Sequence, residues 1–165
     1  MIEALALLSR YEREKISIEW YGDGMDTNNL DDSILSILKK IKQYRLNNVI
    51  SFYPATKDIL NKIQQSDAVG LFSFYEGLPN AICEAMACGK LVVCSAVSDI
   101  PELISYERRV LCNPQDPKTI KEAISYLANL PVDSLKEMGE MNLRIAYKNF
   151  EKEAIINQYL NLFES

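Results

Sequence analysis

Two carboxylates, Glu76 and Glu84, stand on either side of a short turn that enters a helix. Gly77 allows the backbone to turn tightly or at positive φ, and Pro79 suits the first helical position, where its missing N–H has no partner to lose. The free backbone amides of such a turn, together with the helix dipole, form a site for an anion. Glu84 follows about 7.5 Å further along the helix axis. This arrangement suits a diphosphate with a hydroxylated group on each side, which is the shape of a nucleoside diphosphate sugar.

A purely structural explanation fits the same turn. Every strand–turn–helix unit needs a turn at this point, and a glutamate near the start of a helix often does no more than complement the helix dipole. The spacing alone therefore leaves both explanations open.

Composition excludes several other kinds of chemistry. The 165 residues contain no histidine, so a histidine-dependent zinc site, a Cys–His nucleophile and a Ser–His–Asp triad are excluded within this chain. Cys83 and Cys88, the closest of the four cysteines, are five positions apart, too far for paired zinc ligands. We therefore expect no metal site, and buried thiols in a reducing cytosolic protein.

Charge and hydropathy exclude several kinds of binding partner and targeting segment. The net charge of −5 and an isoelectric point near 4.9 disfavour nucleic acid as a partner. No apolar run approaches the roughly 20 residues of a membrane-spanning helix. The apolar patch from Ala4 to Leu8 has no basic segment before it, so we do not expect a signal peptide.

The periodicity of apolar residues alternates between strand and helix along the chain. Unbroken or alternating apolar runs predict strands, and apolar residues at helical spacing predict helices. Helices of this length between strands imply crossover connections and a parallel sheet. We expect one domain over residues 1–165, of α/β class with a doubly wound parallel sheet (Rossmann-like), followed by C-terminal helices over 133–165. The expected strands are 16–21, 49–53, 68–72, 91–94 and 110–112, and we expect 68–72 to be buried on both faces. The expected helices are 1–14, 31–44, 79–88, 120–128, 132–149 and 151–162, together with a helix capped by Thr56 or Asp58.

Such a sheet places its binding site at the carboxyl ends of the strands, where the strand order reverses. The segments to examine are therefore 22–24, 53–54, 73–80 and 95–101.

Residues 76–93, with the sequence EGLPNAICEAMACGKLVV, resemble the E-G-x-P-N-x-x-x-E-A-M-A-x-G-x-P-V-V stretch of family 4 retaining glycosyltransferases. The sequence IPELI at 100–104 and the sequence GDG at 22–24 are similar to further motifs of that family, and Ser73 matches the serine of its P-S-x-x-E motif. The central motif is long and specific, and a weaker likeness extends from Met1 to the C-terminal helices.

The resemblance implies one half of a GT-B fold, the C-terminal domain that binds a nucleotide diphosphate sugar as donor, here expected to be UDP-linked, with no cofactor. Glu76 would contact hydroxyls of the donor sugar and help to place it for reaction, and Glu84 would hold the ribose hydroxyls. The family's loop around the sugar and phosphates matches Gly77, Leu78, Pro79 and Asn80, Ser73 and Gly22 match further donor-binding positions, and Tyr53 and Pro54 fall where the family cradles the base. Transfer would retain anomeric configuration without a metal, onto a polysaccharide or glycolipid acceptor.

Three features depart from the family pattern. The family's phosphate-binding Arg and Lys lie on a first strand and loop upstream of Met1, so we expect this chain to lack that strand and the N-terminal acceptor domain. Ser98-Asp99 replaces the usual Gly-Gly, and Phe72 replaces the usual Pro. We therefore expect weak donor binding and no activity by the chain alone, in a protein of the cytoplasm with peripheral contact at the inner face of the cell membrane in the full-length enzyme.

Two other functions stay open. A nucleotide-sugar 2-epimerase shares the GT-B architecture but would lack the long motif at 76–93. A non-catalytic nucleotide-binding or interaction module is favoured by the missing cations and by Asp99, whereas the pair of glutamates argues against it.

Overall fold

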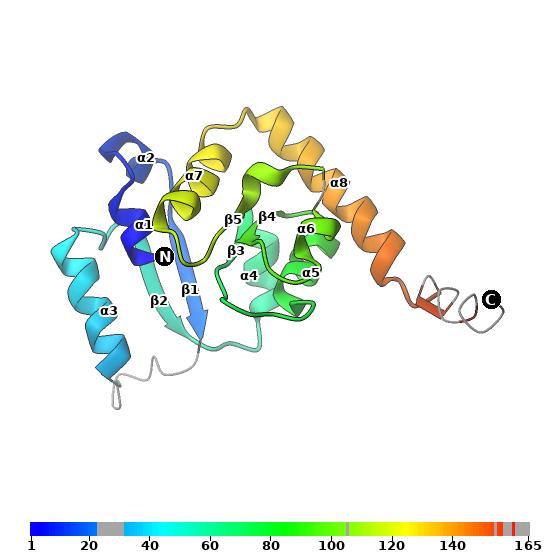
Figure 1. Cartoon of the computed structure of the whole chain (residues 1–165), viewed down its shortest axis with the longest axis horizontal. Coiled ribbons are helices and arrows are strands. Elements are labelled where there is room, and N and C mark those ends of the chain that lie inside the picture. Colours follow the sequence, from blue (N-terminus) through cyan, green and yellow to red (C-terminus); the bar gives the residue numbers. More distant parts are fainter. Residues whose placement is uncertain (23–31, 105, 154, 157–159, 161–165) are drawn as a thin grey trace.

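The computed structural model describes residues 1–22, 32–104, 106–153, 155–156 and 160. The helices and strands of this part alternate along the chain (Figure 1). In chain order they are α1 (Ile2–Ala6), α2 (Arg10–Glu14), β1 (Ile18–Gly22), α3 (Asp32–Gln43), β2 (Ile50–Pro54), α4 (Ile59–Gln65), β3 (Ala68–Leu71), α5 (Asn80–Ala87), β4 (Leu91–Ser95), α6 (Ile100–Leu103), the 3-10 helix η1 (Arg108–Val110), β5 (Leu111–Cys112), α7 (Pro117–Ala128) and α8 (Val132–Phe150).

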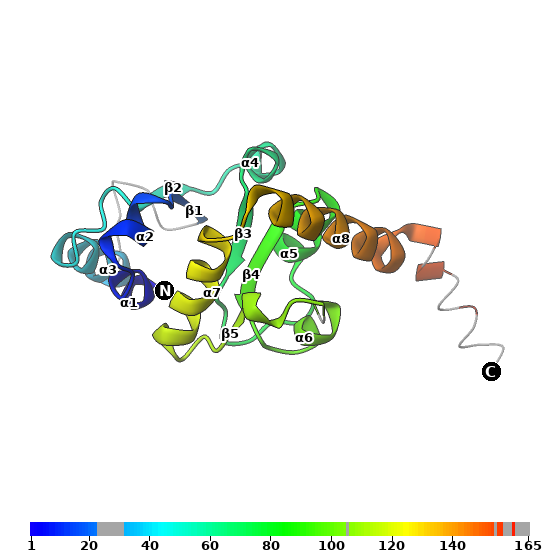
Figure 2. The ribbon, with the colours of Figure 1, turned by 90° about the horizontal axis from the view of Figure 1, so that it is seen from above.

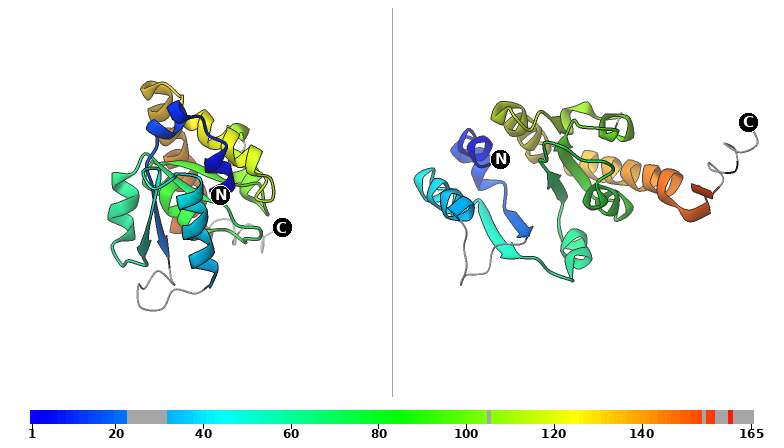
Figure 3. Two further views of the ribbon diagram at one scale, coloured as in Figure 1. Left: turned by 90° about the vertical axis from the view of Figure 1, so that its left-hand side faces the viewer. Right: turned by 60° about the horizontal axis from the view of Figure 1, so that its bottom comes forward.

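All strand pairs in the described part are parallel, which confirms the predicted α/β class. The expectation of one continuous sheet is wrong, because β1 pairs with β2 in one sheet and β3, β4 and β5 form a second. Figure 3 shows the two sheets as separate groups of arrows. The strand orders still follow a doubly wound pattern. From the boundary between β1 and β3, the chain adds β2 on one side and β4 and β5 on the other.

Helices cover both faces of the three-stranded sheet. Seen from above, α7 lies between that sheet and α1, whereas α5, α6 and α8 lie on the opposite side (Figure 2). Helix α3 lies beyond α1, next to the β1–β2 sheet (Figures 1 and 2). Helices therefore cover the central strand of this sheet, β4, on both sides.

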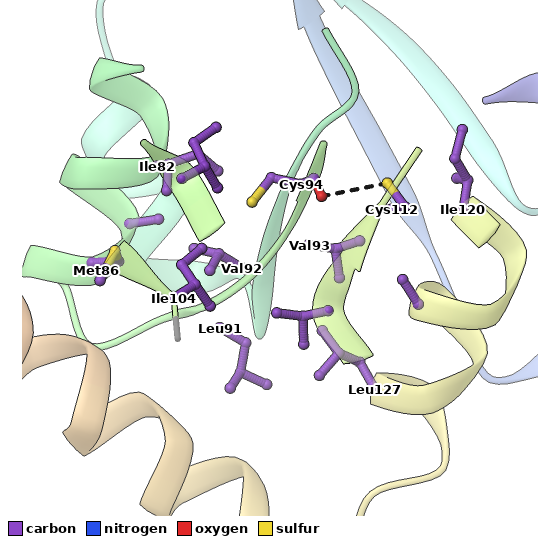
Figure 4. Packing of buried hydrophobic residues seen from close by; sticks show 14 of the residues in the cluster. Ile82, Met86, Leu91, Val92, Val93, Cys94, Ile104, Cys112, Ile120 and Leu127 are labelled. Carbon is purple, nitrogen blue, oxygen red and sulfur yellow. Dashed lines mark hydrogen bonds between the residues drawn. The ribbon is translucent and has the colours of Figure 1, made fainter. Parts of the chain in front are cut away.

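Strand β4 forms the centre of the larger hydrophobic core. All five of its residues are buried, and they pack between α5 on one side and α7 on the other (Figure 4). Burial raises the pKa of Cys94 to about 12 and that of Cys112 to about 11, so both thiols stay protonated. The expectation of buried thiols is confirmed for these two cysteines and is wrong for Cys83 and Cys88, which are only half-buried. The prediction that β3 is buried on both faces is wrong, because its residues are only half-buried and Gly70 is exposed.

A second hydrophobic cluster lies between α1, α3 and the β1–β2 sheet. Ile124 of α7 packs against both clusters and so connects the two cores. Arg13 adds polar contacts here, since its guanidinium donates to the carbonyl oxygens of Ala6, Leu8 and Tyr44. The ends of three helices are thereby held together.

The predicted helix over 1–14 is divided into α1 and α2. The first helix ends at Ala6, and Ser9 caps the second. The Ser9 hydroxyl accepts from the amide of Glu12 at 3.2 Å, and the Glu12 carboxylate accepts from the amide of Ser9 at 2.7 Å. This capping box has the Ser-x-x-Glu pattern that favours a helix start. Asp58 occupies the N-cap position of α4, but its side chain makes no capping hydrogen bond.

Helix α8 packs closely on α5 and then projects away from the sheets (Figure 1). Glu151 is extended and ends α8, and the helix predicted over 151–162 lies partly outside the described residues. The short helix α6 was not predicted, because four residues are too few to show a helical period.

Candidate functional site

The loop that carries Glu76 follows β3 and leads into α5 at the carboxyl edge of the three-stranded sheet. Glu76 is half-buried in the loop, and Glu84 is exposed on α5, four residues after its first residue. Neither carboxylate makes a hydrogen bond or an ion pair within the described residues. Both are therefore available to accept hydrogen bonds from a ligand.

The backbone amides of this loop are also without partners. The carbonyl oxygen of Pro79 accepts from the amides of Ile82 and Cys83 at 3.1 and 3.2 Å, which makes Pro79 the N-cap of α5. The prediction that Pro79 is the first helical residue is therefore wrong by one position. The preceding amides of Asn80 and Ala81 donate to nothing in the described part of the chain. The first amides of a helix have no preceding turn whose carbonyl oxygens could accept from them, and the helix dipole gives that end a partial positive charge.

Gly77 and Leu78 extend the run of unpaired amides. A β-carbon on Gly77 would meet no atom within 4 Å, so this position faces open space. The predicted option of a positive φ at Gly77 is wrong, since Gly89 is the glycine with that conformation among the described residues. Open space beside the backbone, and not the local conformation, is what the structure offers a ligand at Gly77.

Exposed apolar side chains flank this loop, and the sequence analysis selected only Leu78 among them. Phe74 and Tyr75 are 71% and 88% exposed, and Leu78 is 52% exposed. Two neighbouring aromatic residues, Phe74 and Tyr75, shortly after the predicted strand 68–72 were the signal in the sequence. Aromatic rings of this kind offer an apolar surface beside the polar groups of Glu76.

The loop after β4 contributes a strained residue to the same edge. Ser98 has a φ of 50°, in the left-handed region that favours glycine, at the position where the resembling family has glycine. Asp99 follows with a φ of −85° as the N-cap of α6. Ser95, at the end of β4, is buried, and its hydroxyl has no hydrogen-bond partner in the described structure.

The remaining predicted positions divide between the two sheets. Gly22 and Pro54 are paired at the carboxyl ends of β1 and β2, and the Tyr53 ring stacks on Tyr21 at 5.2 Å between ring centroids. Ser73 is half-buried in the loop after β3. Within the described ranges, no hydrogen bond, ion pair or ring contact joins these two groups. Asp23 and Gly24 lie outside the described residues.

The loop itself carries no positive side chain. The sequence from 63 to 89 contains no Lys or Arg, so this segment offers an anion only backbone amides and the helix dipole. Across the described ranges, no group of three or more His, Cys, Asp or Glu side chains is placed to hold a metal ion, and the prediction that none is needed stays a prediction. None of the helices in these ranges is long and apolar enough to cross a membrane.

Known relatives are glycosyltransferases of several specificities. O-antigen chain mannosyltransferase B of Escherichia coli is 35% identical over 92 residues, which are 56% of this chain and 23% of that protein. N-acetyl-alpha-D-glucosaminyl L-malate synthase of Bacillus anthracis is 27% identical over 130 residues, which are 78% of this chain and 34% of that protein. The chain thus spans between 23% and 34% of the length of these curated relatives.

Solved structures share the fold over almost the whole chain. HepE of Anabaena, in complex with UDP and glucose, aligns with a TM-score of 0.80 at 22% identity, covering 99% of this chain and 43% of HepE. A glycosyltransferase from Rickettsia africae aligns with a TM-score of 0.76 at 20% identity, covering 99% and 42%. These neighbours are GT-B glycosyltransferases, and the arrangement of helices and parallel strands in this chain is similar to part of each.

A family model described as glycosyl transferases group 1 matches residues 1–144. This match includes both glutamates, the loop of unpaired amides between them and both sheets. The chain belongs to the family of glycosyl transferases group 1.

Proposed function

We propose that this chain is the donor-binding part of a retaining glycosyltransferase and that it binds a nucleoside diphosphate sugar at the loop between β3 and α5. The diphosphate lies at the unpaired amides of Gly77, Leu78 and Asn80, Glu84 accepts from the ribose hydroxyls, and Glu76 accepts from the sugar. The observation that carries the proposal is the run of unpaired amides between two carboxylates that have no partners of their own.

The relatives support the substrate class without fixing the sugar. HepE was solved with UDP and glucose, whereas other relatives are a mannosyltransferase and an N-acetylgalactosaminyltransferase. A UDP-linked donor is therefore the first to test. Tyr53 and Pro54, at the carboxyl end of β2, form the other wall of the proposed site and lie beside the base.

The loop stabilises charge with donors alone. When the bond between the sugar and the diphosphate breaks, negative charge develops on the leaving diphosphate, and fixed amides at a helix start stabilise such charge without a metal. Glu76 holds the sugar in place for attack by an acceptor hydroxyl from the same face. The acceptor, a polysaccharide or glycolipid, binds to polypeptide beyond these residues.

Calorimetric titration with UDP, GDP and ADP tests the site. Glu84→Gln removes a charge-assisted hydrogen bond to the ribose, which is worth about 1.5–3 kcal/mol, so the affinity for UDP should fall by roughly tenfold or more. Glu137→Gln is the matched control, because Glu137 is an exposed glutamate of α8 without a partner in the described structure. Equal affinity of both variants for UDP would contradict the assignment of Glu84.

A second titration separates the two glutamates. Glu76→Gln should weaken binding of UDP-glucose and leave the affinity for UDP unchanged, since Glu76 faces the sugar and not the nucleotide. Loss of affinity for both ligands would mean that Glu76 contacts the nucleotide.

The non-catalytic module is the second candidate, favoured by the absence of Lys and Arg from 63 to 89 and by exposed Asp99. Absence of binding at millimolar UDP, GDP and ADP would support that alternative over a donor site. The chain alone should transfer no sugar from UDP-glucose to any acceptor, and measured turnover would contradict the need for further polypeptide.

A further inference from the structure

The loop between β3 and α5 combines a carboxylate with exposed apolar side chains. Glu76 is half-buried, whereas Tyr75 before it and Leu78 after it are 88% and 52% exposed. Consecutive Cα atoms are about 3.8 Å apart, so a group held by Glu76 lies within reach of both neighbouring side chains. The loop therefore offers a hydrogen-bond acceptor directly beside apolar surface.

The fold itself does not use these apolar side chains. Phe72 packs against the larger hydrophobic cluster, but Tyr75 and Leu78 belong to neither cluster, and Tyr75 makes no hydrogen bond or ring contact among the described residues. The backbone between them is open as well, since a β-carbon on Gly77 would meet no atom within 4 Å. A ligand that covers this surface gains free energy in proportion to the apolar area that it removes from water.

Charge limits which sugars can lie at the loop. The loop after β4 borders the loop after β3, because β3 and β4 are neighbours in the sheet. It carries the exposed carboxylate of Asp99, and neither 63–89 nor 91–107 contains a Lys or Arg. A sugar with its own carboxylate would meet Glu76 and Asp99 without a compensating cation from either segment. The site therefore favours a neutral sugar over a uronic acid.

The pairing of carboxylate and apolar surface distinguishes among the substituents of neutral sugars. A hydroxyl group donates to a carboxylate but brings no apolar surface, and the methyl group of a 6-deoxy sugar brings apolar surface but no donor. An acetamido group provides both, since its methyl carbon is two bonds from its N–H. It is thus the substituent that fits the loop most fully.

We propose that the site selects a donor sugar that carries an acetamido group. The carboxylate of Glu76 accepts from the acetamido N–H, and the side chains of Tyr75 and Leu78 cover the methyl group. This inference rests on the proposed function, because it assigns a substituent to the sugar that lies at Glu76. It gives the side chains of Tyr75 and Leu78 a role in specificity, separate from the backbone amides that hold the diphosphate.

Calorimetric titration with three donors tests the selection. Covering one methyl-sized group is worth about fourfold in affinity, so UDP-N-acetylglucosamine should bind about fourfold more tightly than UDP-glucose. UDP-glucuronate should bind more weakly than UDP-glucose, because its carboxylate faces two others. The readout is the ratio of affinities, since a change in how the loop holds the diphosphate affects all three donors alike.

Substitutions assign the ratio to the two side chains. Tyr75→Ala and Leu78→Ala should each lower the ratio for UDP-N-acetylglucosamine over UDP-glucose toward one. Tyr147→Ala and Leu7→Ala are the matched controls, because Tyr147 on α8 and Leu7 at the end of α1 are 62% and 52% exposed. The ratio should stay at about fourfold in both controls.

Saturation-transfer NMR locates the methyl group directly. Irradiation of the aromatic protons should transfer saturation to the acetyl methyl of UDP-N-acetylglucosamine in the unaltered chain and in Tyr147→Ala. The transfer should be much weaker in Tyr75→Ala, because the ring that covers the methyl group is then missing.

The outcomes separate this inference from the donor site on which it rests. Binding of UDP-N-acetylglucosamine and UDP-glucose with equal affinity would overturn the selection and leave the donor site intact. A fourfold ratio that persists in both Tyr75→Ala and Leu78→Ala would also overturn it, since other residues would then recognise the acetamido group. Absence of binding by UDP and by all three donors would contradict the donor site itself, and the selection with it.

Discussion

A β-carbon on Gly139 would overlap the backbone carbonyl oxygen of Gly89, because α8 crosses the chain just after α5 at this point. Gly89 has a φ of 67°, which a side chain would strain, and it ends α5 with its amide bonded to the carbonyl oxygen of Met86 at 2.9 Å. The two glycines allow the helices to approach more closely than any other pair of residues would.

Gly139→Ala should therefore destabilise the chain by about 1–3 kcal/mol, the usual cost of overpacking a close contact. This is opposite in sign to the gain of up to about 1 kcal/mol that Gly→Ala gives inside an unhindered helix. Urea unfolding measures the difference, with Lys136→Ala on the exposed face of α8 as control. An increase in stability of the Gly139→Ala chain would show that the helices do not meet here.

Asn142 links α8 to the polypeptide on either side of β4. Its side chain is fully buried, donates to the carbonyl oxygen of Lys90 at 2.7 Å and accepts from the hydroxyl of Tyr106. Burial raises the pKa of Tyr106 to about 12, so this hydroxyl stays a donor at every working pH. Asn142→Ala leaves the half-buried carbonyl of Lys90 and hydroxyl of Tyr106 without their partner and should cost about 2 kcal/mol.

Tyr106→Phe is the matched comparison for Asn142. It leaves only the Asn142 side-chain oxygen without its donor, so the loss should be smaller. In the Asn142→Ala background, Tyr106→Phe should cost less than it does alone, because the interaction is already absent. Additive effects in this double-mutant cycle would contradict the hydrogen bond.

Ser98 is the residue whose backbone conformation should limit stability at the candidate site. A non-glycine residue in the left-handed region costs roughly 1–2 kcal/mol, against about 0.5–1 kcal/mol of chain entropy for glycine. Ser98→Gly should therefore be neutral or stabilising by a few tenths to about 1 kcal/mol, as thermal unfolding would measure. Asp99 has an ordinary φ of −85°, so Asp99→Gly should destabilise the fold. A loss of stability for Ser98→Gly equal to that for Asp99→Gly would exclude backbone strain at Ser98.

Glu12 should make the fold sensitive to acid. Its carboxylate accepts a hydrogen bond from the Ser125 hydroxyl at 2.6 Å and one from the backbone amide of Ser9 at 2.7 Å. The ammonium nitrogen of Lys121 lies 3.2 Å from the same carboxylate. Hydrogen bonds from Ser125 and Ser9 lower the pKa of Glu12 to about 2, from an ordinary value of 4.5.

Because the pKa is lower in the folded chain than in the unfolded chain, this carboxylate stabilises the fold fully above about pH 4.5. The contribution is lost as the pH falls from there to about 2. Urea unfolding at stepped pH should therefore show a smaller acid-induced loss for Glu12→Gln than for the unaltered chain, with Glu137→Gln as control. Parallel profiles for Glu12→Gln and the unaltered chain would contradict this role.

Most elements of the fold followed from apolar periodicity. The pattern of Ile34, Ile37 and Ile41 predicted α3, and the run from Leu91 to Cys94 predicted the central strand. The break between α1 and α2 was missed, although Ser9 and Glu12 form a recognisable capping box, because the charged residues after Ser9 also favour a helix. The separation into two sheets was not predictable, since strand pairing depends on neighbours that periodicity does not identify.

The candidate site was predictable in its sequence position but not in its detail. The glycine, the proline and the two glutamates located the loop between β3 and α5, which the structure places at the carboxyl edge of the sheet. The exposure of Tyr75 and the positive φ of Ser98 depend on how neighbouring loops pack, and residue type alone did not indicate either of them.

The division into two cores has a consequence for how the molecule comes apart. The β1–β2 half meets the other half where α1 and α2 contact α7, through Ile124, the Glu12–Ser125 pair and a 2.6 Å bond from Lys15 to Asn129. Units with separate hydrophobic cores open in separate steps. A molecule bound across both halves would then convert two melting transitions into one, and a calorimeter would register its presence as increased cooperativity.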